Sequence, residues 1–358
     1  MQTRRKKRSW LAPVVLLAII ILLHLFALQG GWVEKVYSTS VYPVISSTLR
    51  SMTGWIPLSV GDVLYALAII WLIFEMIQFF RRKPSWKKLF IRLRNLFVKC
   101  LRVYLIFLVF WGLNYYRYGI SYQLHLAPAE YNADDLKKLT AALVVKLNDS
   151  RKELDSLHYR YPENKTIFRN AIAAYDSARS VYPFLHYNHA AVKRMLWGTV
   201  GNYGGFLGYY NPFTGEAQVD TKVPPFIIPF ITCHEMAHQL GYASESEASF
   251  VGYLVVKAGN SPVFNYSTYF DLFGYANSEL FDRDSIAARN NVRSLDTLVK
   301  QDILAYRKFL RDNENPIEPL LTKIYGNYLK AHNQPQGIES YNEVVGWIVA
   351  YYEKYGVL

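Results

Sequence analysis

The chain has 358 residues, of which 51% are hydrophobic and 16% aromatic, and it carries a formal net charge of +12. Such a composition can bury a large core, which excludes an intrinsically disordered chain, and the length suits one catalytic domain with a membrane segment or two modest domains. The excess positive charge is confined to residues 1–9 and 81–102, and the remainder is close to neutral, which argues against nucleic acid as a partner.

Three apolar runs occupy the first third of the chain, at about 11–28, 58–80 and 103–120. Each is long enough to cross a bilayer, and each is flanked by the Trp, Tyr and basic residues that anchor helices at membrane interfaces. The alternative for the first run is a cleaved signal peptide, and for the other two it is a pair of buried core helices. We predict that residues 1–120 form a membrane domain with three transmembrane helices.

The distribution of basic residues predicts how this domain is oriented. The N-terminus and the segment 81–102 are strongly basic, whereas the segment 29–57 carries only Lys35 and Arg50. Cytoplasmic loops are enriched in Lys and Arg, so the N-terminus is expected in the cytoplasm. Three crossings then place residues 121–358 outside it. The chain is therefore expected to be a multi-pass protein of the cytoplasmic (inner) membrane, with the lipid bilayer as a partner and the second domain extracytoplasmic.

From Ser121 onward the pattern changes to amphipathic helices with polar connectors. Asn132 is a plausible N-cap for the first helix, and further helices are expected at about 293–312, 316–331 and 340–355. Three stripes of apolar residues recur at helical spacing: Leu136, Leu139, Leu143 and Leu147; Phe168, Ile172, Tyr175 and Ala178; and Val192, Met195 and Leu196.

The sequence between Gly204 and Asp220 is typical of β-strands. Two short segments with β-propensity flank the turn sequence from Asn211 to Gly215, which contains Pro and Gly and predicts a hairpin. The expected fold class is therefore mainly α, with three transmembrane helices followed by a mostly helical domain, residues 121–358, that contains one small β-hairpin or sheet.

The chemistry is concentrated in the pentapeptide from His234 to His238, which reads His-Glu-Met-Ala-His. Two histidines four apart on a helix lie on one face and can bind one ion, and Zn²⁺ accepts imidazole nitrogen. Glu235 lies beside the first histidine, where a carboxylate can take a proton from an activated water. The helix is expected to begin between Pro225 and Pro229, because Pro is favoured at a helix start.

The third ligand must come from the segment after this helix, which Gly241 can end with a left-handed cap. The metzincin pattern requires His at the position of Ser244 and therefore fails. The gluzincin pattern takes a Glu from the next helix, and two carboxylates, Glu245 and Glu247, lie in the expected first turn of that helix. Glu247 is the alternative ligand, or else it forms a capping box with Ser244.

The segment Glu245–Tyr253 resembles the ligand helix of the neutral zinc aminopeptidases, because Glu, Ala, Ser, Phe, Val and Tyr fall at the same offsets. The resemblance implies that Glu245 is the third ligand and that Ala248 is the small residue that permits close helix packing. Only six residues separate His238 from Glu245, far fewer than in the aminopeptidases, so a very tight turn is required.

The chain as a whole is similar to domain-of-unknown-function family 3810, a bacterial membrane family. The similarity covers the basic N-terminus, the three apolar runs and two motifs, Tyr209–Val219 and Cys233–Ala243. It implies a gluzincin-like peptidase but supplies no established substrate.

We therefore predict a membrane-anchored zinc metallopeptidase that acts on a peptide or protein substrate. It is expected to bind about one Zn²⁺ per chain through His234, His238 and Glu245, with Glu235 as the general base. One alternative is a catalytically silent, metal-stabilised envelope scaffold, and another is a zinc hydrolase that acts on cell-wall peptides. The presence of Glu235 favours an enzyme, because a structural zinc site does not need a base.

Two further features are candidates for substrate handling. Tyr341, Tyr242 and Tyr253 are candidate donors of a hydrogen bond to the oxyanion that forms during peptide hydrolysis, and none of them is assigned. The hairpin before the motif can hold an extended peptide by adding it to a strand edge, and simple packing is the alternative.

Overall fold

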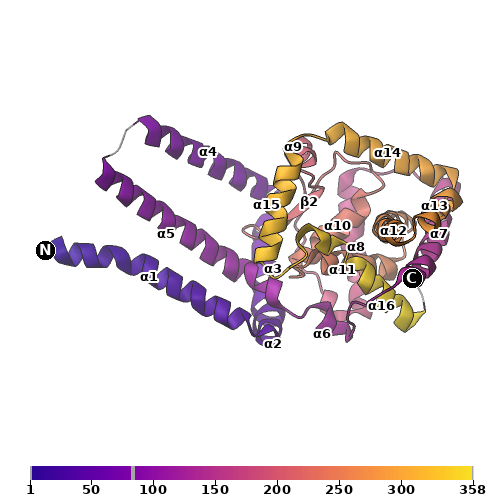
Figure 1. Cartoon of the computed structure of the whole chain (residues 1–358), viewed down its shortest axis with the longest axis horizontal. Helices are drawn as coiled ribbons and strands as arrows, with labels where there is room; N and C mark the ends of the chain where they lie inside the picture. Colours follow the sequence, from indigo (N-terminus) through magenta and orange to yellow (C-terminus); the bar gives the residue numbers. More distant parts are fainter. Residues whose placement is uncertain (1, 82–84, 357) are drawn as a thin grey trace.

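Three long helices project from one side of a body of packed helices (Figure 1). They are α1 (Gln2–Ala27), α4 (Val60–Arg81) and α5 (Trp86–Phe110). The computed structural model describes the backbone of residues 2–81, 85–356 and 358, and the side chains of these residues from 11 onward. The side chains of the first basic segment, and all of Arg82 and Lys83 in the second, therefore lie outside the described residues.

Among the described residues, α4 is the one helix that is both long and apolar enough to cross a membrane by itself, and none of its apolar window is buried. A second candidate consists of Leu11–Ala27 and Gly30–Thr53, which meet at a bend of 95°. The prediction of three transmembrane helices is therefore not confirmed.

The third apolar run, expected as a helix over 103–120, has different bounds in the structure. Helix α5 begins within the basic segment and ends at Phe110, and a 3-10 turn, η2 (Gly112–Tyr116), follows it. Trp111 and Asn114 are buried, with 4% and 1% of their surface exposed. The run continues past the helix because these residues pack against the body, and apolar sequence alone does not distinguish such packing from contact with lipid.

The segment between α1 and α4 is helical rather than a plain connecting loop. It contains α2 (Gly30–Trp32), the π-helix η1 (Val33–Val41) and α3 (Tyr42–Thr53). Ser46 and Arg50 of α3 donate hydrogen bonds of 2.7 and 3.3 Å to the carbonyl oxygen of Gln239. The last carbonyls of a helix lack partners within it and attract positive charge, so α3 stabilises the C-terminal end of the helix with the metal motif.

The body is built from helices that surround the motif helix, α10 (Ile228–Gln239), in which every residue is buried. The expected N-cap is confirmed, because Asn132 forms a capping box with Asp135 at the start of α7. Helices α14, α15 and α16 confirm the last three predicted helices, whereas α12 and α13 had not been predicted. The elements of the body outside the sheet are α6 (Ile120–Leu124), α7 (Ala133–Ser156), α8 (Asn164–Val181), η3 (Pro183–Leu185), α9 (Gly198–Tyr203), α10, α11 (Glu245–Gly259), α12 (Pro262–Arg283), α13 (Ser285–Ser294), α14 (Thr297–Asn313), α15 (Glu318–Ala331), η4 (Gly337–Tyr341) and α16 (Val344–Tyr355).

A three-stranded sheet packs against α10. Its strands are β1 (Val192–Arg194), β2 (Gly208–Asn211) and β3 (Glu216–Val219), in the order β1-β3-β2. Strands β2 and β3 are antiparallel and form the predicted hairpin, while β1 runs parallel to β3. The helical stripe expected at Val192, Met195 and Leu196 was wrong. Met195 continues the sheet pairing by donating to the carbonyl oxygen of Val219 at 2.9 Å, and three apolar residues are too few to define a helical period.

The hairpin also fixes the start of α4. The backbone N–H groups of Val60 and Gly61 donate to the carboxylate of Glu216 at 3.1 and 2.6 Å. These N–H groups have no partner within the helix, and a negative charge is favourable at this end of it. The sheet beside the metal motif is thereby joined to the most apolar of the projecting helices.

Candidate metal centre

The turn between the motif helix and its successor is as tight as the sequence requires. Helix α10 begins at Ile228 with Pro229 in its first turn, as predicted. It ends at Gln239, and Gly241 follows with a φ of +88°, a left-handed conformation that glycine adopts without strain. Helix α11 then begins at Glu245, so the helix end predicted at Gly241 is confirmed.

Small residues let α11 lie close to α10. A Cβ atom on Gly252 would lie 3.2 Å from Cε2 of Phe230 and 3.5 Å from the backbone nitrogen of His234. Ala248, one turn earlier on α11, is fully buried. The close approach of the two helices places the first turn of α11 opposite the face of α10 that carries the histidines.

The structure brings His234, His238 and Glu245 together as a buried cluster whose candidate ligand atoms all lie within 4.8 Å of one another. The Nε2 atoms of the two histidines lie 3.2 and 3.3 Å from the same oxygen, Oε2 of Glu245. Two ligands bound tetrahedrally at zinc–ligand distances of about 2.0–2.1 Å are about 3.3 Å apart. The donor set and its spacing therefore fit a zinc ion.

Each candidate ligand is oriented by a further contact. Nδ1 of His238 donates to the carbonyl oxygen of Tyr242 at 2.7 Å, and Nδ1 of His234 lies 3.1 Å from Oγ of Ser249. The hydroxyl of Tyr325 donates to Oε1 of the cluster's carboxylate at 2.6 Å. Such partners fix the orientation of metal-binding side chains and leave Nε2 of each histidine directed at the shared oxygen.

Two of these orienting residues were not found from the sequence. Ser249 lies four residues after Glu245 on the same helix, so helical spacing could have indicated it. Tyr325 is one of 29 tyrosines in the chain and lies 80 positions from the carboxylate that it contacts, on α15. No local pattern distinguishes it from the other tyrosines.

The charges inside the cluster interact strongly. Burial alone would raise the pKa of Glu245, but the positive charge of His238 and hydrogen bonds from both histidines hold it well below its usual range. Burial alone would lower the pKa of His238, yet the charge of Glu245 raises it to about 9. Burial lowers the pKa of His234. These pKa shifts indicate an ion pair between a protonated His238 and an ionised Glu245. A metal ion bound by His238 would release the proton of this histidine.

Glu235 lies beside the cluster but is not a member of it. Its Oε2 atom is buried and has no hydrogen-bond partner among the described residues. Burial raises the pKa of Glu235 to about 8, near the pH at which a general base exchanges protons most effectively. Strand β2 comes very close at Gly208, where a Cβ atom would lie 2.7 Å from Oε1 of Glu235. The carboxylate is therefore held between the sheet and the cluster with one acceptor oxygen free.

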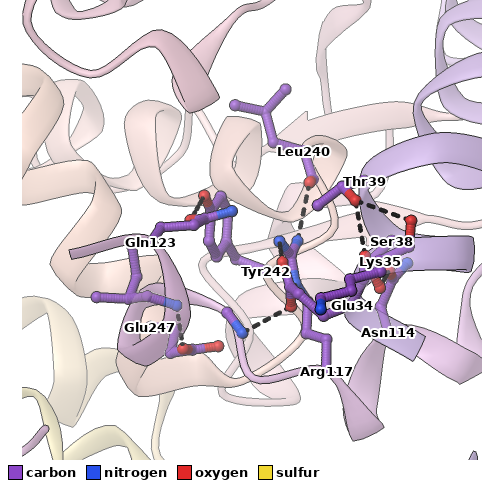
Figure 2. Close-up of polar contacts among 12 residues, drawn as sticks. Glu34, Lys35, Ser38, Thr39, Asn114, Arg117, Gln123, Leu240, Tyr242 and Glu247 are labelled. Carbon is purple, nitrogen blue, oxygen red and sulfur yellow. Dashed lines mark hydrogen bonds and ion pairs between the residues drawn. The ribbon is translucent and has the colours of Figure 1, made fainter. Parts of the chain in front are cut away.

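Glu247, the alternative ligand, turns away from the cluster toward the chain that follows α5 (Figure 2). Its carboxylate accepts a hydrogen bond of 2.8 Å from the backbone N–H of Ile120. The alternative role considered for Glu247, a capping box with Ser244, is not found, because the Ser244 side chain contacts Oγ of Ser246 at 3.0 Å and caps no backbone group. Gly119 makes the observed contact possible, since a Cβ atom there would clash with the carboxylate.

A buried ion pair supports the same turn from the side of the projecting helices (Figure 2). Arg117 donates to both carboxylate oxygens of Glu34, with 2.7 Å between Nη2 and Oε1. It also donates to the carbonyl oxygen of Leu240 at 3.4 Å, and its guanidinium lies 4.7 Å from the ring centre of Tyr242. Because Tyr242 supplies the carbonyl that orients His238, this ion pair also contributes to the position of a candidate ligand.

Two adjoining cavities open onto the cluster. The first, about 360 Å³, is lined by His234 and Glu235 and extends past the start of β2 to Asp271 on α12. The second, about 390 Å³, is also lined by Glu235 and reaches aromatic residues at the body ends of α4 and α5, among them Tyr65 and Phe107. The candidate site therefore lies at the junction between the body and the projecting helices.

Of the three tyrosines considered as oxyanion donors, Tyr341 alone lines both cavities. Its ring stacks on that of His234, with 6.4 Å between the ring centres. Tyr242 instead donates to the side chain of Gln123, and Tyr253 packs against aromatic residues of α11 and α16. Of the three, only Tyr341 therefore lines the cavities beside the cluster.

The fold and the site define a mainly helical protein in which two consecutive helices bring together a buried His–His–Glu cluster. The chain belongs to the family described as protein of unknown function (DUF3810), whose model matches residues 37–349. No curated protein and no solved structure matches the chain.

Proposed function

We propose that this chain is a zinc-dependent, gluzincin-like peptidase that holds its metal through His234, His238 and Glu245. The observation that carries the proposal is the convergence of two Nε2 atoms on one oxygen of Glu245, 3.2 and 3.3 Å away. Beside this cluster lies a buried oxygen of Glu235 that has no hydrogen-bond partner in the described part of the chain. That oxygen favours an enzyme over a metal-stabilised scaffold, because a structural zinc site needs no base. Peptide bonds in proteins or in cell-wall peptides suit this chemistry.

The side chains around the cluster have separate roles in the proposed reaction. Zinc in such a site lowers the pKa of water toward neutrality and polarises the carbonyl group of the bond to be cleaved. Glu235 accepts a proton from the attacking water and returns it to the leaving amine nitrogen. The hydroxyl of Tyr341 donates a hydrogen bond to the developing oxyanion. Tyr325 and Ser249 keep the ligands in position.

We propose that β2 positions the substrate backbone. It is one of the two edge strands of the sheet, and no strand pairs with its other side within the described ranges. Residues 204–208, which lead into β2, line the first cavity together with Glu235. An extended peptide can add to a strand edge through main-chain hydrogen bonds, and Gly208 lets this strand lie close to the base, because a Cβ atom there would be 2.7 Å from Oε1 of Glu235.

We also propose that the projecting helices anchor the chain in the cytoplasmic membrane with the body outside the cytoplasm. The apolar side chains of α4 are exposed along most of its length, which supports contact with lipid. The basic segment 81–102 supports the orientation. Since the second cavity reaches Tyr65 and Phe107 at the body ends of α4 and α5, the centre would lie close to the membrane surface.

Reporter fusions test this orientation. Alkaline phosphatase fused after Leu358 is expected to be active, because it folds only outside the cytoplasm, whereas a cytoplasm-dependent fluorescent protein at the same position should be dark. The same two reporters fused within the basic segment 81–102 serve as the control and should give the opposite result. A fluorescent fusion at Leu358 with inactive phosphatase would reverse the orientation and move the substrates to the cytoplasm.

Metal removal tests the proposed chemistry. The full chain, purified in detergent, is expected to hydrolyse members of a mixed library of internally quenched peptides. A zinc chelator should abolish this activity, because Glu235 alone cannot activate water at a useful rate. Addition of zinc after removal of the chelator should restore it, and magnesium should not, because imidazole is a poor ligand for magnesium. Hydrolysis that persists at full rate in the metal-free chain would contradict the proposal.

A further inference from the structure

Asp271 on α12 differs from the acids that stabilise the fold, because it has no hydrogen-bond or ion-pair partner among the described residues. Glu34 is paired with Arg117, and Glu216 accepts hydrogen bonds from the start of α4. Among the described residues, Asp271 accepts no hydrogen bond and forms no ion pair, a property that it shares with Glu235. Both of these unpaired carboxylates line the first cavity.

Among the described residues that line the first cavity, two are acids and none is Lys or Arg. Besides Asp271 and Glu235, its polar side chains are those of His234, Ser249, Tyr275, Thr322, Tyr325, Tyr341 and Asn342. Burial raises the pKa of Asp271 to about 7. Asp271 is only partly exposed, so a charge on its carboxylate without a partner costs free energy, and a cation beside it reduces that cost.

We propose that the α12 end of the first cavity is a subsite for a cationic group of the substrate, which Asp271 holds as an ion pair. The inference rests on the proposed peptidase function and narrows its substrates to peptides with a positive charge near the cleaved bond. The rings of Tyr275 and Tyr341 line the same cavity and favour a cation over a neutral group. The charge can come from a basic side chain or from a free amino terminus.

Matched peptides test the subsite through hydrolysis. One set carries Lys or the uncharged norleucine at each position around the cleaved bond, and a second set has a free or an acetylated amino terminus. The wild-type chain should cleave the cationic member of one set with a kcat/KM at least about 10-fold higher, the effect of a hydrogen-bonded ion pair. Asp271→Asn should lose this preference, keep its rate on the neutral peptides and keep its zinc. Asp282→Asn, which removes a charge from the exposed face of the same helix, should behave as the wild type.

Binding measurements test the cationic subsite independently of the proposed peptidase activity. Calorimetry of the full chain with Nα-acetyl-lysine amide, Nε-acetyl-lysine amide and Nα-acetyl-norleucine amide distinguishes a side-chain ammonium, a free α-amino group and no charge. At least one cationic compound should bind about 10-fold more tightly than the neutral one, and Asp271→Asn should abolish the difference. Equal binding of all three to the wild-type chain would overturn the subsite even if hydrolysis is confirmed. Hydrolysis that does not depend on Glu235 would overturn the peptidase proposal, while a charge-dependent difference in binding would still support the subsite.

Discussion

Glu235→Gln is expected to lower the rate of peptide hydrolysis by a factor of about 10² or more, while the purified chain keeps about one zinc. The amide has the same size as the carboxylate but cannot take up a proton at neutral pH. Glu235 is not a member of the His–His–Glu cluster, and among the residues that the structure describes its Oε2 atom has no hydrogen-bond partner whose loss would disturb the fold. Hydrolysis of the quenched peptide library and zinc content should be measured on the same preparation.

Tyr341→Phe is the matched comparison for this experiment, because it removes only a hydroxyl from the same cavity. We expect it to lower kcat with little change in KM or zinc content, as for the loss of an oxyanion donor. A Glu235→Gln chain that hydrolyses peptides at the wild-type rate would remove the peptidase proposal. If the Glu235→Gln chain also restores the growth of a strain that lacks the gene, and does so to the same extent as the wild-type chain, the catalytically silent scaffold would be favoured.

The parts of the site that were predictable from the sequence depend on short-range spacing. His234 and His238 share a helix face because they are four residues apart, and this holds in any helix. Pro229 and Gly241 mark the two ends of that helix through backbone preferences that need no tertiary information. The approach of Glu245 to the histidines follows from the short turn between α10 and α11 once both helices are identified.

The parts that were not predictable depend on residues far apart in the sequence. Tyr325 contacts the cluster from α15 and Asp271 lines the first cavity from α12, and no local pattern connects either residue to the motif. Helix α12 itself had not been predicted, because nearly every residue in its first half is buried and the sequence shows no amphipathic period there. The apolar run around Trp111 was assigned to a membrane helix, although the body covers it.

Measurements of zinc content are expected to show which of Glu245 and Glu247 is the third zinc ligand. Glu245→Gln should reduce zinc well below one per chain, as should His234→Ala and His238→Ala, because each change removes a donor from the cluster. Glu247→Gln should retain about one zinc, since its carboxylate contacts the backbone N–H of Ile120 rather than the histidines. The measurement is elemental analysis of the full chain after purification in detergent and removal of loosely bound metal.

The two glutamine variants form a closely matched pair, because both glutamates lie in the first turn of α11 and are buried, with 3% and 8% of their surface exposed. They differ only in what their carboxylates contact. Glu247→Gln can still accept the hydrogen bond from Ile120, and burial already disfavours the charge of this carboxylate by raising its pKa to about 7, so the change should reduce stability by at most about 1 kcal/mol without a loss of metal. A chain that loses zinc with Glu247→Gln and keeps it with Glu245→Gln would show that the ligand is assigned two residues too early. Unchanged zinc in all four variants would show that the cluster is not a metal site, and the proposed reaction would then lose its basis.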